Sequence, residues 1–217
     1  MGDIFREIDE ELRQEKYEKL WQRYGKLIIA AGVAIVLAVA GYKGWEQYQT
    51  SRRIEDGARF STAKTLMENG KAEDARALFD ALGRESGTSY GDLARFHSAA
   101  LRAKAGDLAG AADDYGKIAA DSEITEPLRD LAVVLGALHA INNPSADMAS
   151  VNARLQPLSE AGNPWRHSSL EILGLIARKS GDLKTARNYF QRLVDDAEAA
   201  SGVRGRASQM LAIMGPK

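Results

Sequence analysis

The feature that most constrains this chain is an uncharged apolar run, Leu27 to Tyr42, bracketed by Lys26 and Lys43. As a helix, these sixteen residues span roughly 24 Å, which is short of the ~30 Å hydrocarbon core of a bilayer. The flanks can supply the difference, because lysine side chains reach toward the headgroups and aromatic rings favour the interface. The run therefore predicts a transmembrane helix over residues 27–45.

Aromatic and cationic residues lie on both sides of this run. The flanking residues expected to anchor the helix in lipid are Trp21, Tyr24, Lys26, Lys43 and Trp45. Residues 12–26 contain five lysines or arginines and the fifteen residues from Lys43 contain three, which predicts a cytoplasmic N-terminus. We therefore expect a cytoplasmic segment over residues 1–26 and an exported domain over residues 46–217. In a Gram-negative bacterium this is a single-pass inner-membrane protein with a periplasmic domain.

Two features of the N-terminal region leave alternatives open. Ala38-Val39-Ala40 fits a signal-peptide cleavage pattern, although secretory signals begin with a short basic segment and this one is long and acidic. Ile4, Ile8 and Leu12 recur every four residues, which is typical of an amphipathic helix. Such a helix could lie on the cytoplasmic leaflet or dock on a membrane partner, or it could be a solvated stub that only sets topology.

Three short phrases recur beyond the apolar run, and each has a glycine, an alanine five residues later and an aromatic residue four further on. The phrases contain Gly70, Ala75 and Phe79; Gly106, Ala111 and Tyr115; and Gly181, Ala186 and Phe190. A glycine after a helix adopts the left-handed capping conformation, the small alanine permits close helix packing, and the aromatic ring fills the space between hairpins. The second glycine follows the first by 36 residues and precedes the third by 75. A weaker repeat is therefore expected near Asn143-Pro144.

This pattern resembles the tetratricopeptide repeat, in which each unit is a hairpin of two helices and neighbouring units bury a shared core. The last repeat fits best, since it also has Leu173-Gly174 in its first helix. In the weaker repeat, Pro144 and Pro157 indicate an altered second helix, and residues 203–214 are expected to form a capping helix. The expected fold is all-α, with one transmembrane helix followed by a tetratricopeptide-like α-solenoid of about four hairpins.

The N-terminal segment is similar to a narrower family. It is acidic and amphipathic and ends in Leu20-Trp21, Tyr24 and Gly25, followed by one apolar helix and the repeats. This layout resembles the YfgM-like ancillary subunits of the SecYEG translocon. The resemblance implies an inner-membrane location and, as partners, the SecYEG channel and periplasmic chaperones such as PpiD.

The sequence gives little reason to expect catalysis. It contains no cysteine, and His97, His139 and His167 fall in three different hairpins without a metal-binding spacing. The net charge of −1 provides no basic field for nucleic acid. We therefore predict a protein that is not an enzyme and that has no cofactor, metal or nucleic-acid partner.

Binding of polypeptides is the function that remains, and repeat arrays bind with a concave face built mainly from the first helix of each hairpin. Transferring the groove positions of the tetratricopeptide superfamily by spacing gives Phe60, Lys64, Met67, Phe96, Ala100, Lys104, Val133, Ala137, Glu171, Leu175 and Arg178. The alternative for Phe60 and Phe96 is a place in the core. Exposed phenylalanines beside lysines would suit translocating or partly unfolded chains. The predicted function is a membrane-tethered interaction module linking translocation to periplasmic chaperones, and the alternative is a scaffold for envelope assembly or cell division.

Overall fold

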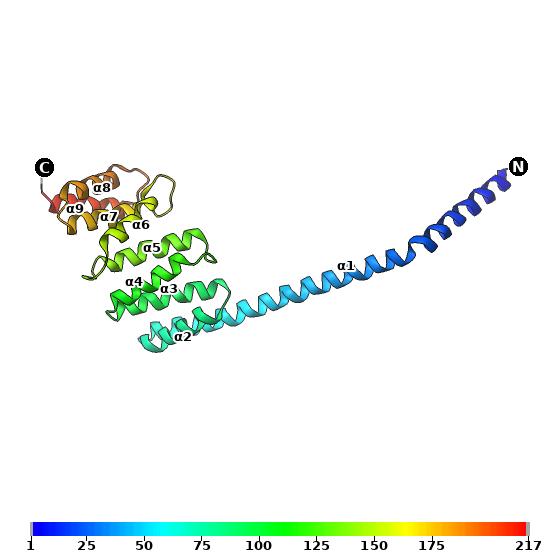
Figure 1. Cartoon of the computed structure of the whole chain (residues 1–217), viewed down its shortest axis with the longest axis horizontal. Helices are drawn as coiled ribbons and strands as arrows, with labels where there is room; N and C mark the ends of the chain where they lie inside the picture. Colours follow the sequence, from blue (N-terminus) through cyan, green and yellow to red (C-terminus); the bar gives the residue numbers. More distant parts are fainter. Residues whose placement is uncertain (1, 216–217) are drawn as a thin grey trace. The chain divides into compact units, whose positions relative to one another are not determined.

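A computed structural model describes the backbone of residues 2–215 and the side chains of Glu18 and of residues 21–215. Between residues 2 and 215 the chain forms nine α-helices, one short 3-10 helix and no strand, so the predicted all-α fold is confirmed (Figure 1). The chain divides into two compact units, one ending at Ile54 and the other beginning at Glu55. The first helix, α1 (Gly2–Glu68), continues without a break across this division.

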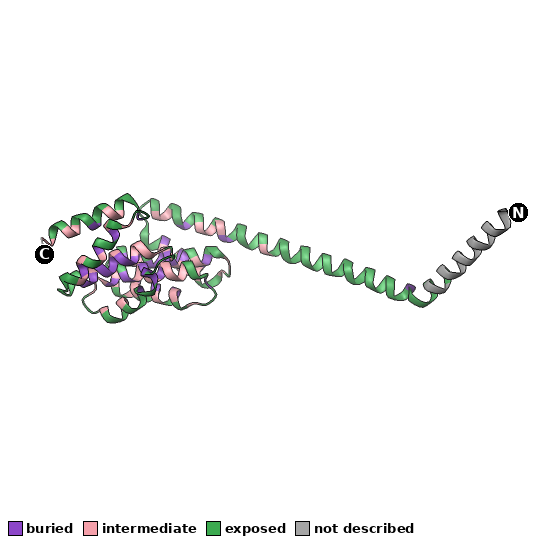
Figure 2. Ribbon diagram, turned by 90° about the horizontal axis from the view of Figure 1, so that it is seen from above, coloured by how far each residue is buried: buried purple, intermediate pink, exposed green. Residues whose placement is uncertain are grey.

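The first unit consists of the part of α1 that ends at Ile54. It contains the one segment, among the described residues, that is long and apolar enough to cross a membrane. Every residue from 26 to 48 is exposed, as the unbroken colour along this part of α1 shows (Figure 2). The predicted boundaries at residues 26 and 45 both lie inside α1. Residues 2–17 are helical, and their predicted apolar stripe lies outside the described side chains.

The second unit is a stack of helical hairpins, coloured from cyan to red in Figure 1. The last turns of α1 pack on α2, and α3, α5 and α7 each pack on the helix that follows, while α9 packs on α8. The bounds are α2 Ala72–Glu85, α3 Ser89–Lys104, α4 Leu108–Ala120, α5 Glu126–Ala140, α6 Met148–Leu155, α7 Arg166–Lys179, α8 Leu183–Asp195 and α9 Ser201–Ile213. The predicted capping helix over residues 203–214 corresponds to α9.

The three glycines that defined the repeat phrases close the turns between the paired helices. Gly70, Gly106 and Gly181 have φ angles of 77°, 95° and 84°, a region that side chains with a Cβ rarely adopt. Asp107 and Asp182 then cap the next helix, because their carboxylates accept hydrogen bonds from backbone N–H groups in the first turns of α4 and α8. The turn chemistry expected from the sequence is therefore present.

The alanines and aromatic residues of the three phrases form the centres of the core. All six are at most 1% exposed, and they are Ala75, Phe79, Ala111, Tyr115, Ala186 and Phe190. Five of the six belong to three core clusters, which hold Ala75 and Phe79, Tyr115, and Ala186 and Phe190. A fourth cluster, around α5 and α7, lies between the last two, and the buried stretches of the helices are coloured in Figure 2. Each cluster draws residues from neighbouring helices, so the hairpins share one continuous apolar interior.

The third hairpin departs from the others, as its sequence predicted. Its second helix, α6, has only eight residues, and a 3-10 helix, Pro157–Ser159, follows. The aligned alanine and aromatic positions are filled by Met148 and Asn152, which are both only partly buried. Leu155 and Leu158 enter the core instead. The remainder of a normal second helix is thus replaced by a 3-10 turn that buries Leu158, while Leu155 is buried at the end of α6 itself.

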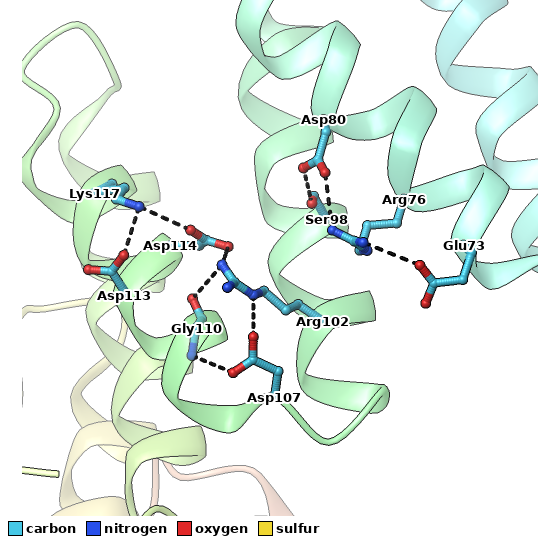
Figure 3. A network of polar contacts seen from close by, with 10 residues as sticks. All are labelled: Glu73, Arg76, Asp80, Ser98, Arg102, Asp107, Gly110, Asp113, Asp114 and Lys117. Atoms are coloured by element: carbon cyan, nitrogen blue, oxygen red, sulfur yellow. Dashed lines mark hydrogen bonds and ion pairs between the residues drawn. The ribbon is translucent and has the colours of Figure 1, made fainter. Parts of the chain in front are cut away.

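Ion pairs and hydrogen bonds reinforce the first two hairpins (Figure 3). Arg102 on α3 pairs with Asp107 at 2.6 Å and with Asp114 on α4 at 2.9 Å. The pKa of Asp107 lies below its ordinary value, first because the Gly110 N–H donates to its carboxylate and then because Arg102 does. On α2, Asp80 accepts a hydrogen bond from a serine of α3. These contacts fix how successive helices face one another.

Candidate protein-interaction surface

The eleven residues of the predicted interaction surface come from the last turns of α1 and from α3, α5 and α7, which are the first helices of the four hairpins. The structure divides them by exposure. Lys64, Ala100, Lys104 and Arg178 are exposed; Phe60, Met67, Val133, Glu171 and Leu175 are half-buried; and Phe96 and Ala137 are buried. Three of the four exposed members are cations, so the charge of this surface is relevant to which partner it could bind.

Phe60 belongs to a compact aromatic group in the first two hairpins. Its ring meets Phe79 edge-on at a centroid distance of 5.4 Å and His97 at 5.3 Å, while His97 stacks on Phe79 at 4.9 Å. The ring of Tyr90 also lies near Phe60, at a centroid distance of 5.7 Å. Phe60 therefore packs on the core with one edge and remains partly accessible to solvent.

The surroundings of His97 favour the neutral form of its imidazole. Burial among the aromatic rings lowers its pKa below the ordinary value of 6.5, and the positive charge of Lys64 lowers it further. The pKa of His139 is also lowered by burial, and its ring stacks on Tyr115 at 5.7 Å. Both histidines thus pack their rings against core aromatic residues, in surroundings that lower their pKa.

Phe96 and Ala137 are in the core. Phe96 is 8% exposed and shares a cluster with Tyr115, at a centroid distance of 6.0 Å. Ala137 is 4% exposed and lies in the cluster that joins α5 to α7. The burial of Phe96 therefore agrees with the alternative that this residue belongs to the core. For Phe60, which is only half-buried, both a core contact and an accessible edge are present.

The charged members of the surface differ in their partners. Glu171 on α7 is bound by the guanidinium of Arg206 on α9 at 2.6 and 2.8 Å. Lys64, Lys104 and Arg178 form no ion pair or hydrogen bond with any residue between 21 and 215. The acid of the set is therefore neutralised within the protein, whereas the cations are available to a partner.

Sequence reasoning missed several exposed apolar residues on the same helices. Tyr90 and Leu93 on α3 and Leu138 on α5 are between 36% and 44% exposed. Leu138 also lines a hollow with two predicted residues, Leu175 and Arg178. The superfamily spacing omits these positions, and only the packing of the helices shows that they remain open.

The five residues predicted to flank the membrane anchor all lie on α1 and are exposed: Trp21, Tyr24, Lys26, Lys43 and Trp45. Lys43 pairs with Glu46 at 2.6 Å, and the rings of Trp45 and Tyr48 lie 5.9 Å apart. Arg52 then places its guanidinium 5.3 Å from the ring of Tyr48. Beyond the apolar run, the helix thus presents aromatic rings together with ionic groups, the combination that membrane interfaces favour.

The third histidine also has a structural contact. His167 lies 3.0 Å from a carboxylate oxygen of Asp196, to which Arg166 also binds at 2.6 Å. The pKa of Asp196 is lowered first by the backbone N–H of Glu198 and then by His167. In the part of the chain with described side chains, no group of three or more histidines and acids could hold a metal ion.

Together these features define a class of protein, an α-solenoid of helical hairpins preceded by a long apolar helix. The chain matches the family model described as a tetratricopeptide repeat-like domain over residues 18–211, and it belongs to that family. The match begins before the apolar run, so the family pattern includes this helix as well as the hairpins. Such domains are in general non-catalytic protein-interaction modules. No curated protein and no solved structure matches the chain.

Proposed function

We propose that this protein is a non-catalytic interaction module that α1 anchors in the inner membrane, with its N-terminus in the cytoplasm and its hairpins in the periplasm. The observation that carries the proposal is the exposure of the apolar run. Eight leucine, isoleucine and valine side chains between residues 27 and 39 are each more than half exposed. Moving them from water into hydrocarbon is favourable by on the order of 10 kcal/mol.

A membrane accounts for this exposure better than a packed protein core would. The helix is uncharged from residue 27 to residue 42, and interfacial residues occur at both ends. A helix that packs on a protein core and meets solvent has a polar face on its solvent side. Here apolar side chains surround the helix on all sides, although all sides are exposed, and a bilayer would cover all of them. The proposed division is a cytoplasmic segment over residues 1–26, a transmembrane helix over 27–45 and a periplasmic domain over 46–217.

The choice of partner rests on different support. The hairpins supply a general protein-interaction surface, and the segment with Trp21 and Tyr24 resembles the ancillary subunits of the SecYEG translocon. We infer that this segment and the transmembrane helix associate with the channel, while the hairpins bind emerging polypeptides and chaperones such as PpiD. In this arrangement the protein would connect translocation with folding in the periplasm.

Topology can be tested with single cysteines, because the natural sequence has none. Gly87 is exposed, and a Cβ built there meets nothing within 4 Å, so Gly87→Cys should be tolerated. In cells with a permeabilised outer membrane, an impermeant maleimide should label Gly87→Cys and leave Asp3→Cys unlabelled until the inner membrane is opened. Equal labelling of both would refute the topology, and a soluble mature form beginning at Gly41 would refute the anchor.

Partners can be tested by photo-crosslinking from positions in each part of the chain. Probes at Trp21 and Trp45 should capture channel subunits, and a probe at the exposed Ala100 should capture exported chains or chaperones. Phe96 is unsuitable for this purpose because it is buried. A matched probe at Leu183, which is exposed at the start of α8, controls for random collision. Capture of division or cell-wall proteins without the channel would favour the scaffold alternative.

A further inference from the structure

The first helix of the third hairpin, α5, packs against the first helix of the fourth hairpin, α7. The two helices contact each other directly, beside a second helix, α6, of eight residues. One core cluster contains Val134 and Ala137 of α5 together with Ile172, Leu173 and Ile176 of α7. These two helices are the first helices of successive hairpins, and their packing brings residues near the ends of both helices to one place on the surface.

A hollow of about 410 Å³ lies at the C-terminal ends of these two helices. We call it the α5–α7 hollow, and it is lined by Leu138, Ile141, Asn142, Leu175, Arg178 and Lys179. Its volume falls within the ~300–1,000 Å³ typical of ligand sites. Three lining residues are apolar, two are cationic and one is an amide, and none is acidic. The hollow is therefore apolar with a positively charged rim.

The two cations of the rim are in different states. The ammonium group of Lys179 donates to the backbone carbonyl of Ile141, which holds its charge at the end of α5. Arg178 is exposed and has no ion-pair or hydrogen-bond partner in the described part of the chain. Its five N–H groups are in water, arranged in the planar fork that matches a carboxylate.

We propose that the α5–α7 hollow binds an extended polypeptide segment in which an apolar side chain stands next to an acidic one. The apolar side chain would cover Leu138, which is 44% exposed, together with Leu175, while the carboxylate pairs with Arg178. The nearest acid of the predicted surface, Glu171, is already neutralised by Arg206 and so does not oppose this charge. The inference rests on the proposed function and specifies the segment that this part of the surface prefers.

The test uses the full chain in nanodiscs of a zwitterionic lipid and three fluorescent peptides. The peptides share the same leucines in a Gly-Ser framework and differ only in whether the residues beside the leucines are Glu, Gln or Lys. Fluorescence anisotropy gives the affinity of each peptide for the wild type, for Arg178→Glu and for Leu138→Ser. Matched controls are Arg192→Glu and Leu183→Ser, which alter an exposed arginine and an exposed leucine on α8.

The Glu peptide should bind more tightly than the Gln peptide, and the Lys peptide should bind least. Arg178→Glu should weaken the Glu peptide about fivefold, because one attraction is lost and one repulsion is gained at a solvent-exposed site. Leu138→Ser should weaken all three peptides by a similar factor of about three. The two α8 variants should bind as the wild type does, and circular dichroism confirms that each variant is folded.

The remaining outcomes separate this inference from the function on which it rests. If the Glu peptide binds equally to wild type and Arg178→Glu, or if the Lys peptide binds best, the α5–α7 hollow is the wrong site or has the wrong preference. The proposed interaction module then still stands. If none of the three peptides binds and no exported chain is crosslinked at Ala100, both the site and the proposed polypeptide-binding function are refuted.

Discussion

The last hairpin packs tightly at Gly174, in the middle of α7. A Cβ added there would lie 2.8, 2.9 and 3.1 Å from three ring carbons of Phe190 on α8. The ring is 0% exposed and is surrounded by the cluster that also holds Leu170 and Leu193, so it has no free space into which to turn. Gly174→Ala is therefore a small change placed where the two helices have no room.

Two opposing effects determine how Gly174→Ala changes the free energy of unfolding. Alanine in a helix interior is more stable than glycine by about 1 kcal/mol. Overpacking a close-packed core costs about 1–3 kcal/mol, because the ring or the backbone must shift. The clash should prevail, giving a net loss of about 1 kcal/mol in the free energy of unfolding. Gly205→Ala on α9 is the matched control, since a Cβ there meets nothing within 4 Å and only the helix gain of up to about 1 kcal/mol remains.

Urea unfolding of the full chain in detergent can measure both variants. Replacing Trp21 and Trp45 by phenylalanine leaves Trp165 as the single tryptophan of a chain that contains three. Its indole N–H donates to the carbonyl of Pro127 at 2.9 Å, so its fluorescence reports the hairpins around α7. The two substitutions should shift the midpoint in opposite directions. A Gly174→Ala variant as stable as Gly205→Ala would refute the argument that close α7–α8 packing requires glycine.

Three further measurements test other parts of the hairpin stack. Burial and Lys64 lower the pKa of His97, so as the pH falls through 6.5 the unfolded state binds a proton at this side chain before the folded state does. Stability should therefore decrease between pH 7 and pH 5. Thermal unfolding followed across that range should show a shallower decrease for His97→Gln. Asp56 is 4% exposed and accepts hydrogen bonds from two hydroxyl groups of the α2–α3 connection. Asp56→Ala should therefore lower the free energy of unfolding in urea by about 2 kcal/mol. The control Glu55→Ala, at the exposed neighbouring position, should be nearly neutral. Gly181→Ala, at a φ of 84°, should cost about 1–2 kcal/mol by the same assay, and a neutral result would contradict a left-handed turn there.

Much of the fold could be predicted because the relevant information is local. A glycine that ends one helix and an aspartate that begins the next act on backbone groups a few residues away, as at Gly106 and Asp107. The spacing from Gly181 to Ala186 and Phe190 places both side chains on one face of the following helix, where they become fully buried. Such features follow from helix geometry and turn chemistry, so the sequence alone was sufficient.

The interaction surface was less predictable because its composition depends on packing between distant segments. The spacing that selected Phe96 does not specify how far α3 rotates toward α4 and α5, and in the structure the ring is buried against Tyr115. Leu138 was missed because it lies on a helix whose apolar residues mostly face inward, whereas its own side chain is exposed. The two prolines predicted that α6 was altered, but they gave no indication of the contact between α5 and α7.

The charge of the surface shows most clearly how a distant element can set a local property. By sequence, the predicted surface contains Lys64, Lys104, Glu171 and Arg178, a mixed set with no strong preference. The pairing of Glu171 with Arg206, 35 residues away, leaves three cations without an opposing acid. Both carboxylate oxygens of Glu171 are bound by the guanidinium of Arg206, so the negative charge of the predicted surface is compensated within the protein. The capping helix α9 covers the last apolar face, as a repeat array requires. Through Arg206 it also neutralises the acid of the predicted surface, and we expect this to favour the binding of acidic segments there.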